Sequence, residues 1–228
     1  GIGRFLIEDG RRVVVWPSPG VTSEALSQHL TGPVLAIALM QRGVLVLHGA
    51  VVGIAGHAIV VLGHTGEGKS TTAAACAARG HQVLSDDLAP VDLTEAGLTV
   101  RPTSSLVRLV DPDSAGLPGR LRWQAADKTV VRIDERAPDE RMGVAAIARL
   151  REGDRVEVTR LGRVEAALVL IEHAFCRPVF QAPQAAAHLT WCAQAAARCP
   201  VVSLVRPSRR DELGEVVSAL ERLPAICP

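Results

Sequence analysis

The chain has 228 residues, 48% of them hydrophobic, which is enough for one compact domain with a buried core and a small appendage. Its 25 basic and 24 acidic side chains leave a formal charge of +1, which excludes a chain-wide attraction to nucleic acid or to an anionic membrane. No apolar run reaches the roughly 18 residues of a membrane-spanning helix, and the first residues have too little apolar length for a signal peptide. We therefore expect a cytoplasmic protein with neither nucleic acid nor a membrane as its partner.

The cysteines indicate a reducing compartment. There are 5 of them, they form no CxxC pair, and an odd number cannot close into a simple disulfide framework. Free cysteine packs as a small hydrophobic residue. We predict reduced thiols that mostly fill the core: Cys76, Cys176, Cys192, Cys199 and Cys227.

The first 42 residues are predicted to form a small strand-helix appendage, and residues 43–228 the main domain. Residues 4–16 form two short strands around the turn EDGR, and residues 22–42 form a helix broken at Gly32-Pro33. Residues 43–63 hold three apolar runs separated by Gly49 and by Ala55-Gly56-His57. This pattern predicts three adjacent strands of a buried sheet.

The rest of the chain alternates between strand and helix patterns. A glycine-rich loop over residues 63–68 leads into a helix that ends near Gly80, and residues 88–102 are predicted to form a hairpin. The polar segment 114–141 is expected to be mobile or to face a substrate. Together the elements predict an α/β domain: strands over 81–85, 144–151, 156–161 and 201–207, and helices over 163–175, 183–199 and 210–223.

The loop carries the full P-loop pattern between a predicted strand and a predicted helix. Glycines allow successive backbone N–H groups to point at one anion, and the helix N-terminus adds its positive dipole end. Lys69 would bind the β- and γ-phosphates, and the Ser70 hydroxyl would bind Mg²⁺. The alternative is a glycine-rich turn without a ligand. The predicted ATP-binding residues are Gly63, His64, Thr65, Gly66, Glu67, Gly68, Lys69, Ser70 and Thr71.

Two adjacent carboxylates, Asp86 and Asp87, follow the strand after the P-loop helix. Neighbouring side chains of a regular strand point to opposite faces, so both can serve one site only if the strand ends there and the chain turns. One would then hold Mg²⁺ and the other would accept a hydrogen bond from an incoming hydroxyl group. In the alternative, one aspartate holds the metal and the other is a solvated turn residue.

The histidines of the chain are candidates for catalysis or for metal binding. His48, in an apolar strand, is either a satisfied core residue or a hydrogen-bond donor to the transferred phosphate or to Asp87. The other six histidines show no ligand spacing on one face, which predicts no zinc site: His29, His57, His64, His81, His173 and His188.

Three segments, LHGAVV, GHTGEGKSTTAAACAARGH and LSDDLAPV, resemble the catalytic core of the HPr kinase/phosphorylase family over residues 47–91. The fold of that family is similar to phosphoenolpyruvate carboxykinase. The resemblance implies an ATP- and Mg²⁺-dependent kinase that phosphorylates a serine hydroxyl of a protein or peptide. It places the proton acceptor at Asp87, the catalytic histidine at His48, and the metal-side carboxylate at Asp86, with Lys69 and Ser70 in the roles given above.

The chain departs from the full-length enzymes of that family. Only residues 1–42 precede the first core strand, where those enzymes have a separate N-terminal domain. Compact relatives phosphorylate a serine of a lasso-peptide precursor, and others phosphorylate free L-serine. The family also has a further metal-binding acid and a catalytic arginine. Candidates here are Asp111 or Asp113 for the acid, and Arg108, Arg120 or Arg122 for the arginine. The alternative for each is a solvated surface charge.

The sequence thus predicts a P-loop serine kinase that acts on a peptide. Two other classes stay open at this point: a P-loop NTPase that hydrolyses nucleotide, and a nucleotide-binding regulatory module without phosphate transfer. No glutamine or glutamate is evident that would activate water, apart from Glu67 in the loop itself.

Overall fold

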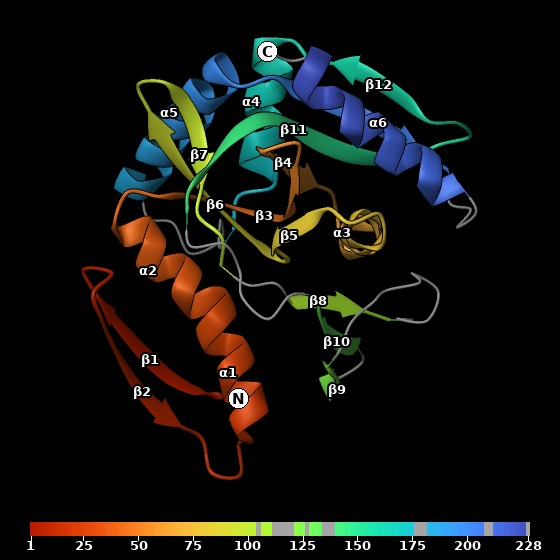
Figure 1. Ribbon diagram of the computed structural model, residues 1–228. Helices are drawn as coiled ribbons and strands as arrows, with labels where there is room; N and C mark the ends of the chain where they lie inside the picture. Colours follow the sequence, from red (N-terminus) through yellow and green to blue (C-terminus); the bar gives the residue numbers. More distant parts are fainter. Residues whose placement is uncertain are drawn as a thin grey trace.

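The structure is a computed structural model, and it describes residues 1–103, 106–110, 121–125, 128–133, 140–175, 182–207 and 212–226. A mixed sheet flanked by helices forms its centre, which confirms the expected α/β class (Figure 1). Within these residues the main sheet has 8 strands: in spatial order β12 (Glu157–Arg160), β13 (Val201–Arg206), β11 (Met142–Glu152), β4 (His57–Leu62), β3 (Leu45–Ile54), β6 (Leu88–Thr94) and β7 (Gly97–Val100), with β5 (Gln82–Ser85) beside β3.

Strand β3 changes its neighbours half-way along. Residues 45–48 pair antiparallel with β6, and residues 49–54 pair antiparallel with β4. Gly49 lies at this change, so the expectation that Gly49 separates two strands is wrong, and residues 43–63 form two strands instead of three. A Cβ at Gly49 would lie 2.7 Å from the carbonyl oxygen of Val61. Glycine is therefore needed here for the close approach of β3 and β4.

Strand β11 also joins two parts of the sheet. It runs parallel to both β4 and β13, and its first two residues pair antiparallel with β7. Parallel neighbours buried on both faces have near-continuous apolar sequences, as β4 does. The order β4, loop, α3 (Lys69–Ala78) then places the P-loop at the end of a central strand.

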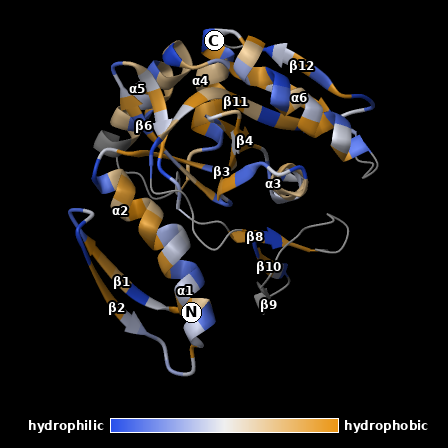
Figure 2. Ribbon diagram, in the orientation of Figure 1, coloured by the Kyte–Doolittle hydropathy of each residue, from blue (hydrophilic) through white to orange (hydrophobic). Residues whose placement is uncertain are grey.

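Helices cover both faces of the sheet. Helices α3 and α6 (Leu213–Ile226) pack on the face that includes Val61, and α4 (Arg163–Glu172) and α5 (Ala182–Arg198) pack on the face that includes Leu62. The alternation of Val61 and Leu62 follows the period of two in a strand. Figure 2 shows apolar and polar residues mixed along α6, as expected for a helix with one face on the core.

The N-terminal residues form the expected strands and broken helix. Strands β1 (Gly3–Glu8) and β2 (Arg12–Pro17) pair as a separate hairpin, and α1 (Ser23–His29) continues through a wide turn, Leu30–Val34, into α2 (Leu35–Gln41). Gly32 has φ −105° and ψ −106°, and Pro33 lacks the N–H group that a regular helix needs. Whether residues 1–42 form a separate appendage stays a prediction.

A small second sheet lies next to α3. It contains β8 (Leu106–Leu109), β10 (Lys128–Arg132) and β9 (Leu121–Ala125), in the order β8, β10, β9. Val107, Leu109 and Val131 join the apolar cluster of α3. The segment 114–141 was expected to be mobile or to face a substrate, and two stretches of it form the strands β9 and β10. Most of the other residues of this segment lie outside the described residues, and so do Asp111 and Asp113.

Most other local expectations are confirmed. Strands β5, β12 and β13, the β6–β7 hairpin and helices α4, α5 and α6 lie within a few residues of their predicted bounds. Cys76 and Cys192 are free and buried, and Cys199 is buried as well, whereas Cys176 and Cys227 lie outside the described residues. None of the helices in the described part of the chain is long and apolar enough to span a membrane.

Candidate functional site

The P-loop joins β4 to α3 and leaves the helix N-terminus open. Gly68, at the N-cap of α3, has φ +89°, and Gly66 has φ +91°, a left-handed backbone that glycine adopts without strain. No side chain in the described part of the chain caps the helix, so the N–H groups of its first turn are available to an anion. The loop has the shape that phosphate binding requires.

Lys69 lies inside this loop, and only 7% of the residue is exposed. Its ammonium group donates to the carbonyl oxygens of Gly63 at 2.8 Å and His64 at 3.2 Å. Burial lowers the pKa of Lys69, while the nearby carboxylates of Asp86 and Asp87 oppose that shift. A buried cation beside open N–H groups suits the terminal phosphates of a nucleotide.

Ser70 and Asp86 lie together, as the metal prediction requires. The Ser70 hydroxyl donates to Oδ1 of Asp86 at 2.9 Å, and the backbone N–H of Arg108 donates to Oδ2 at 2.9 Å. Burial raises the pKa of the Asp86 carboxyl, and the hydrogen bonds from Arg108 and Ser70 and the charge of Arg108 offset that effect only in part. The Ser70 hydroxyl and the Asp86 carboxylate offer two oxygen ligands. They fit a Mg²⁺ ion, which takes few protein ligands and completes its shell with phosphate and water.

Asp87 is held in place by three elements. Strand β5 ends at Ser85, and Asp87 has φ +90°, which turns its side chain to the same site as Asp86. Oδ1 lies 3.1 Å from Nδ1 of His48, and Oδ2 lies 3.2 Å from Nη1 of Arg108. The backbone N–H of Gly49 donates to the Asp87 carbonyl at 3.3 Å. The condition for both carboxylates to face one site is met.

The surroundings favour the ionised form of Asp87. Burial raises its pKa, but the hydrogen bond from His48 and the charges of His48, Arg108 and Lys69 outweigh that effect and hold the pKa below its ordinary value. A carboxylate has about four lone-pair directions, so the two partners leave room for a hydroxyl donor. Among the interpretations of His48, that of a hydrogen-bond donor to Asp87 matches the distance between Nδ1 of His48 and Oδ1 of Asp87.

Three cavities meet at Asp87. One, of about 350 Å³, holds the P-loop, Lys69 and Ser70; a second, also about 350 Å³, extends toward the end of α4; and a third, of about 450 Å³, extends toward α1. Asp87 lines all three. An acceptor could therefore reach this carboxylate from a side that the P-loop does not occupy.

Three basic side chains that the sequence did not assign firmly to the site lie close to the P-loop. Arg108, one of three candidates for the catalytic arginine, lines the P-loop cavity, as does Lys128 at the start of β10. The side chains of Arg120 and Arg122 lie outside the described residues. Arg206, at the end of β13, donates from Nε to the carbonyl oxygen of Glu67 at 2.9 Å. Arg206 gave no local signal, because its role depends on a contact 139 residues away in sequence.

Glu67 does not point into the P-loop cavity. Its carboxylate accepts from the backbone N–H of His64 at 2.6 Å and lies beside Gly63. It stabilises the loop itself, and it is not among the residues that line the cavity with Lys69.

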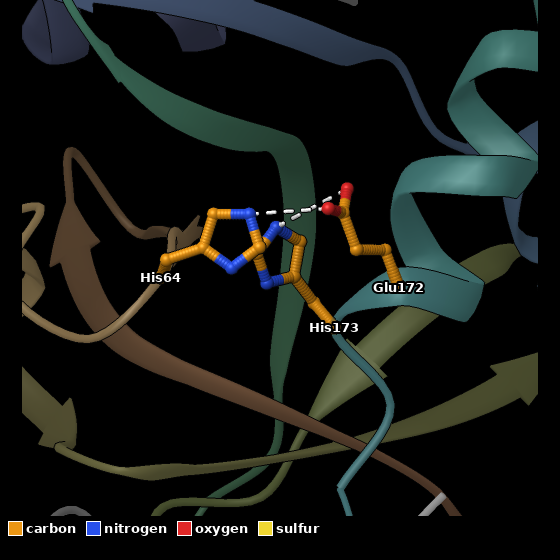
Figure 3. A group of neighbouring side chains, drawn as sticks. All are labelled: His64, Glu172 and His173. Carbon is orange, nitrogen blue, oxygen red and sulfur yellow. Dashed lines mark ion pairs between the residues drawn. The ribbon is translucent and has the colours of Figure 1, made fainter.

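Two histidines and a glutamate converge at the other side of the loop. Oε1 of Glu172 lies 3.1 Å from Nε2 of His64, and Oε2 lies 4.0 Å from Nε2 of His173 (Figure 3). The sequence spacing of the histidines predicted no zinc site, and the fold, not sequence spacing, brings His64 and His173 together with Glu172. The one local signal is the pair Glu172-His173 at the end of α4.

Gly68→Ala is expected to destabilise the protein more than Gly66→Ala, by about 1 kcal/mol. Both positions have φ near +90°, so both variants share the same backbone strain. A Cβ at Gly68 would also collide with the Arg206 guanidinium and break its bond to Glu67, whereas a Cβ at Gly66 meets no atom within 4 Å. Urea denaturation of the two variants measures the difference, and equal unfolding free energies would contradict the bracing role of Arg206.

His173 is expected to make the protein less stable in acid. Burial, and to a lesser degree the charges of His64 and Arg149, lower the pKa of His173 to about 4 from 6.5. Between these values the unfolded chain binds more protons, so the free energy of unfolding falls as the pH drops from 6.5 toward 4. From pH 7 to pH 4.5 the His173 contribution is about 2 kcal/mol. Urea denaturation at pH 7 and pH 4.5 measures this loss, and His173→Gln should lack the His173 contribution. An equal decrease in the free energy of unfolding of both proteins would show that His173 is not the cause.

The chain was compared with family models, with curated proteins and with solved structures. No family model matches the sequence, and the search of curated proteins found no match. A solved structure of the Hpr(Ser) kinase/phosphatase from Coxiella burnetii is similar to this chain: 11% of residues are identical, the match covers 79% of this chain and 98% of that one, and the TM-score is 0.44.

Proposed function

We propose that this protein is an ATP- and Mg²⁺-dependent kinase that transfers the γ-phosphoryl group to a serine hydroxyl of a peptide or protein. The observation that carries the proposal is the position of Asp87. It lies in the cavity of Lys69 and Ser70, its carboxylate is held by His48 and Arg108, and it opens onto two further cavities. A nucleotide in the P-loop and a hydroxyl group from another side would meet there.

Each residue then has a separate task. The N–H groups of the loop and Lys69 bind the phosphate oxygens, and Asp87 orients the hydroxyl and takes its proton. His48 and Arg108 keep Asp87 ionised and fixed, and Lys128 adds positive charge to the cavity. A Mg²⁺ ion held by Ser70 and Asp86 would neutralise charge on the phosphates.

The α1 side supports a peptide as the acceptor. The 450 Å³ cavity there is lined by Ser23, Ser27 and Gln28 of α1, by Thr31 of the turn that follows, and by Asp87. Hydroxyl and amide groups along an open groove suit the hydrogen bonds of an extended peptide backbone. The resemblance of residues 47–91 to compact kinases adds to this, and we propose a natural-product precursor of the lasso-peptide kind, in the cytoplasm. Free L-serine is the second candidate acceptor.

A kinase is favoured over an NTPase by the direction of Glu67. The glutamate of the loop is engaged by the backbone N–H of His64, so it is not placed to orient a water molecule at the terminal phosphate. Simple hydrolysis would need another group for that task.

Mass spectrometry of acceptors incubated with the protein, ATP and Mg²⁺ tests this function. Serine-containing precursor peptides, the same peptides with alanine in place of serine, and free L-serine form the panel. The kinase proposal expects one added phosphate on a serine acceptor and little ADP without one. Rapid ADP formation that no acceptor changes would identify an NTPase, and nucleotide binding without any turnover would identify a regulatory module.

A further inference from the structure

We propose that His64, Glu172 and His173 form a binding site for a divalent transition-metal ion of the zinc class, separate from the Mg²⁺ position at Ser70 and Asp86. One potential ligand atom from each residue lies within 4.8 Å of the other two. Figure 3 shows both imidazole rings turned toward the Glu172 carboxylate. Two histidines and one carboxylate are a ligand set of zinc sites that keep an open position.

The orphan nitrogen of His173 is the strongest sign of a missing ligand. Its side chain is 97% buried, because only 3% is exposed, and its Nε2 atom has no hydrogen-bond partner in the described residues. Leaving a buried polar nitrogen unpaired costs free energy, so a native protein commonly has a partner for it. The nearest group is the Glu172 carboxylate at 4.0 Å, beyond hydrogen-bond distance.

The site combines one fixed ligand with two adjustable ones. The backbone N–H of His173 donates to Val169 and its carbonyl accepts from His48 at 2.7 Å, so its ring has a rigid base. The side chains of His64 and Glu172 are 53% and 42% exposed and can move the short distance that coordination requires. All three residues line one cavity of about 350 Å³, through which an ion and a fourth ligand, water, can enter.

Nitrogen ligands separate this site from the magnesium position. Imidazole suits Zn²⁺ and its neighbours in the transition series, whereas Mg²⁺ prefers oxygen ligands such as those of Ser70 and Asp86. An ion here would also join the P-loop, through His64, to the end of α4. Binding should therefore stabilise the fold by mass action, whether or not nucleotide is present.

The positive charge of Arg149 opposes the binding of a metal ion at this site, and its removal provides a second test. Its Nη2 atom lies 3.7 Å from Oε2 of Glu172 and 3.3 Å from Nε2 of His64. In the absence of a metal, this guanidinium neutralises the carboxylate. A bound cation must displace it, so removal of the Arg149 charge should tighten metal binding.

Titration of the nucleotide-free protein with Zn²⁺, followed by calorimetry and thermal unfolding, tests the site. The titration uses a variant with the substitutions Cys176→Ser and Cys227→Ser, so that no thiol outside the described residues binds the metal. We expect one ion per chain and a rise in Tm, and Co²⁺ should give the visible absorption of a four-coordinate site. Glu172→Gln and His64→Ala should each weaken binding by more than about tenfold.

The controls separate a built site from surface binding. Glu165→Gln on the same helix and His57→Ala at the exposed first residue of β4 should leave Zn²⁺ affinity unchanged, and circular dichroism checks the fold of each variant. Arg149→Met should bind Zn²⁺ more tightly than the parent protein. Equal affinities for the parent and Glu172→Gln, or no binding by the parent, would overturn the proposal. Because nucleotide is absent from these titrations, a failure here leaves the proposed kinase function untouched.

Discussion

Asp87→Asn is expected to lower the rate of phosphate transfer by about 10² to 10⁴ while ATP binding stays close to that of the parent protein. Asparagine keeps the shape of the side chain and can still contact Arg108, but it cannot take a proton from the acceptor hydroxyl. The Lys69 and Ser70 contacts that would hold the nucleotide do not involve the Asp87 side chain. Fluorescent-nucleotide titration and a phosphate-transfer assay give the two quantities separately.

The control for this variant is Asp154→Asn, at an exposed turn between β11 and β12. It removes the same charge from the chain and should leave transfer unchanged. Because His48 and Arg108 both contact Asp87, thermal unfolding must show that Asp87→Asn is folded at the assay temperature. Normal transfer by a folded Asp87→Asn would remove Asp87 from the reaction.

Lys69→Ala is expected to weaken ATP binding by roughly 10- to 100-fold, since a hydrogen bond to a charged group contributes about 1.5 to 3 kcal/mol. Transfer should fall below detection, because the same ammonium group would balance the charge that moves with the γ-phosphoryl group. Calorimetric titration with ATP and Mg²⁺ measures the first effect, and the transfer assay measures the second.

The buried position of Lys69 calls for a second variant. Alanine leaves a cavity in the loop and removes the donor to Gly63 and His64. Lys69→Met fills most of that space without the charge. Both variants should lose transfer alike if the charge matters, whereas a Lys69→Met protein with parental transfer would show that the lysine only supports the loop.

Local sequence signals predicted the parts of the site that lie close together in the chain. The P-loop follows from glycine spacing between an apolar strand and a helix, and the turn at Asp86-Asp87 follows from two charges at the end of strand β5. The break at Gly32-Pro33 follows from a missing N–H group and a flexible glycine.

Other features depend on which strands become neighbours, and a single sequence does not contain that information locally. Gly49 looks like a turn residue, but it lies in a strand because β3 passes from β6 to β4 at that point. Arg206 and the His64, Glu172 and His173 cluster come from segments more than 100 residues apart in sequence. Packing of β13 and α4 around the P-loop brings them together, so spacing rules for metal ligands missed them.

A crystal structure with Mg²⁺ and a non-hydrolysable ATP analogue is the most direct test of the central claim. The account predicts the triphosphate over the N-terminus of α3, with the terminal phosphate between Lys69 and Asp87 and the ion between Ser70 and Asp86. Binding of the nucleotide elsewhere, or a terminal phosphate that neither Lys69 nor Asp87 approaches, would contradict it.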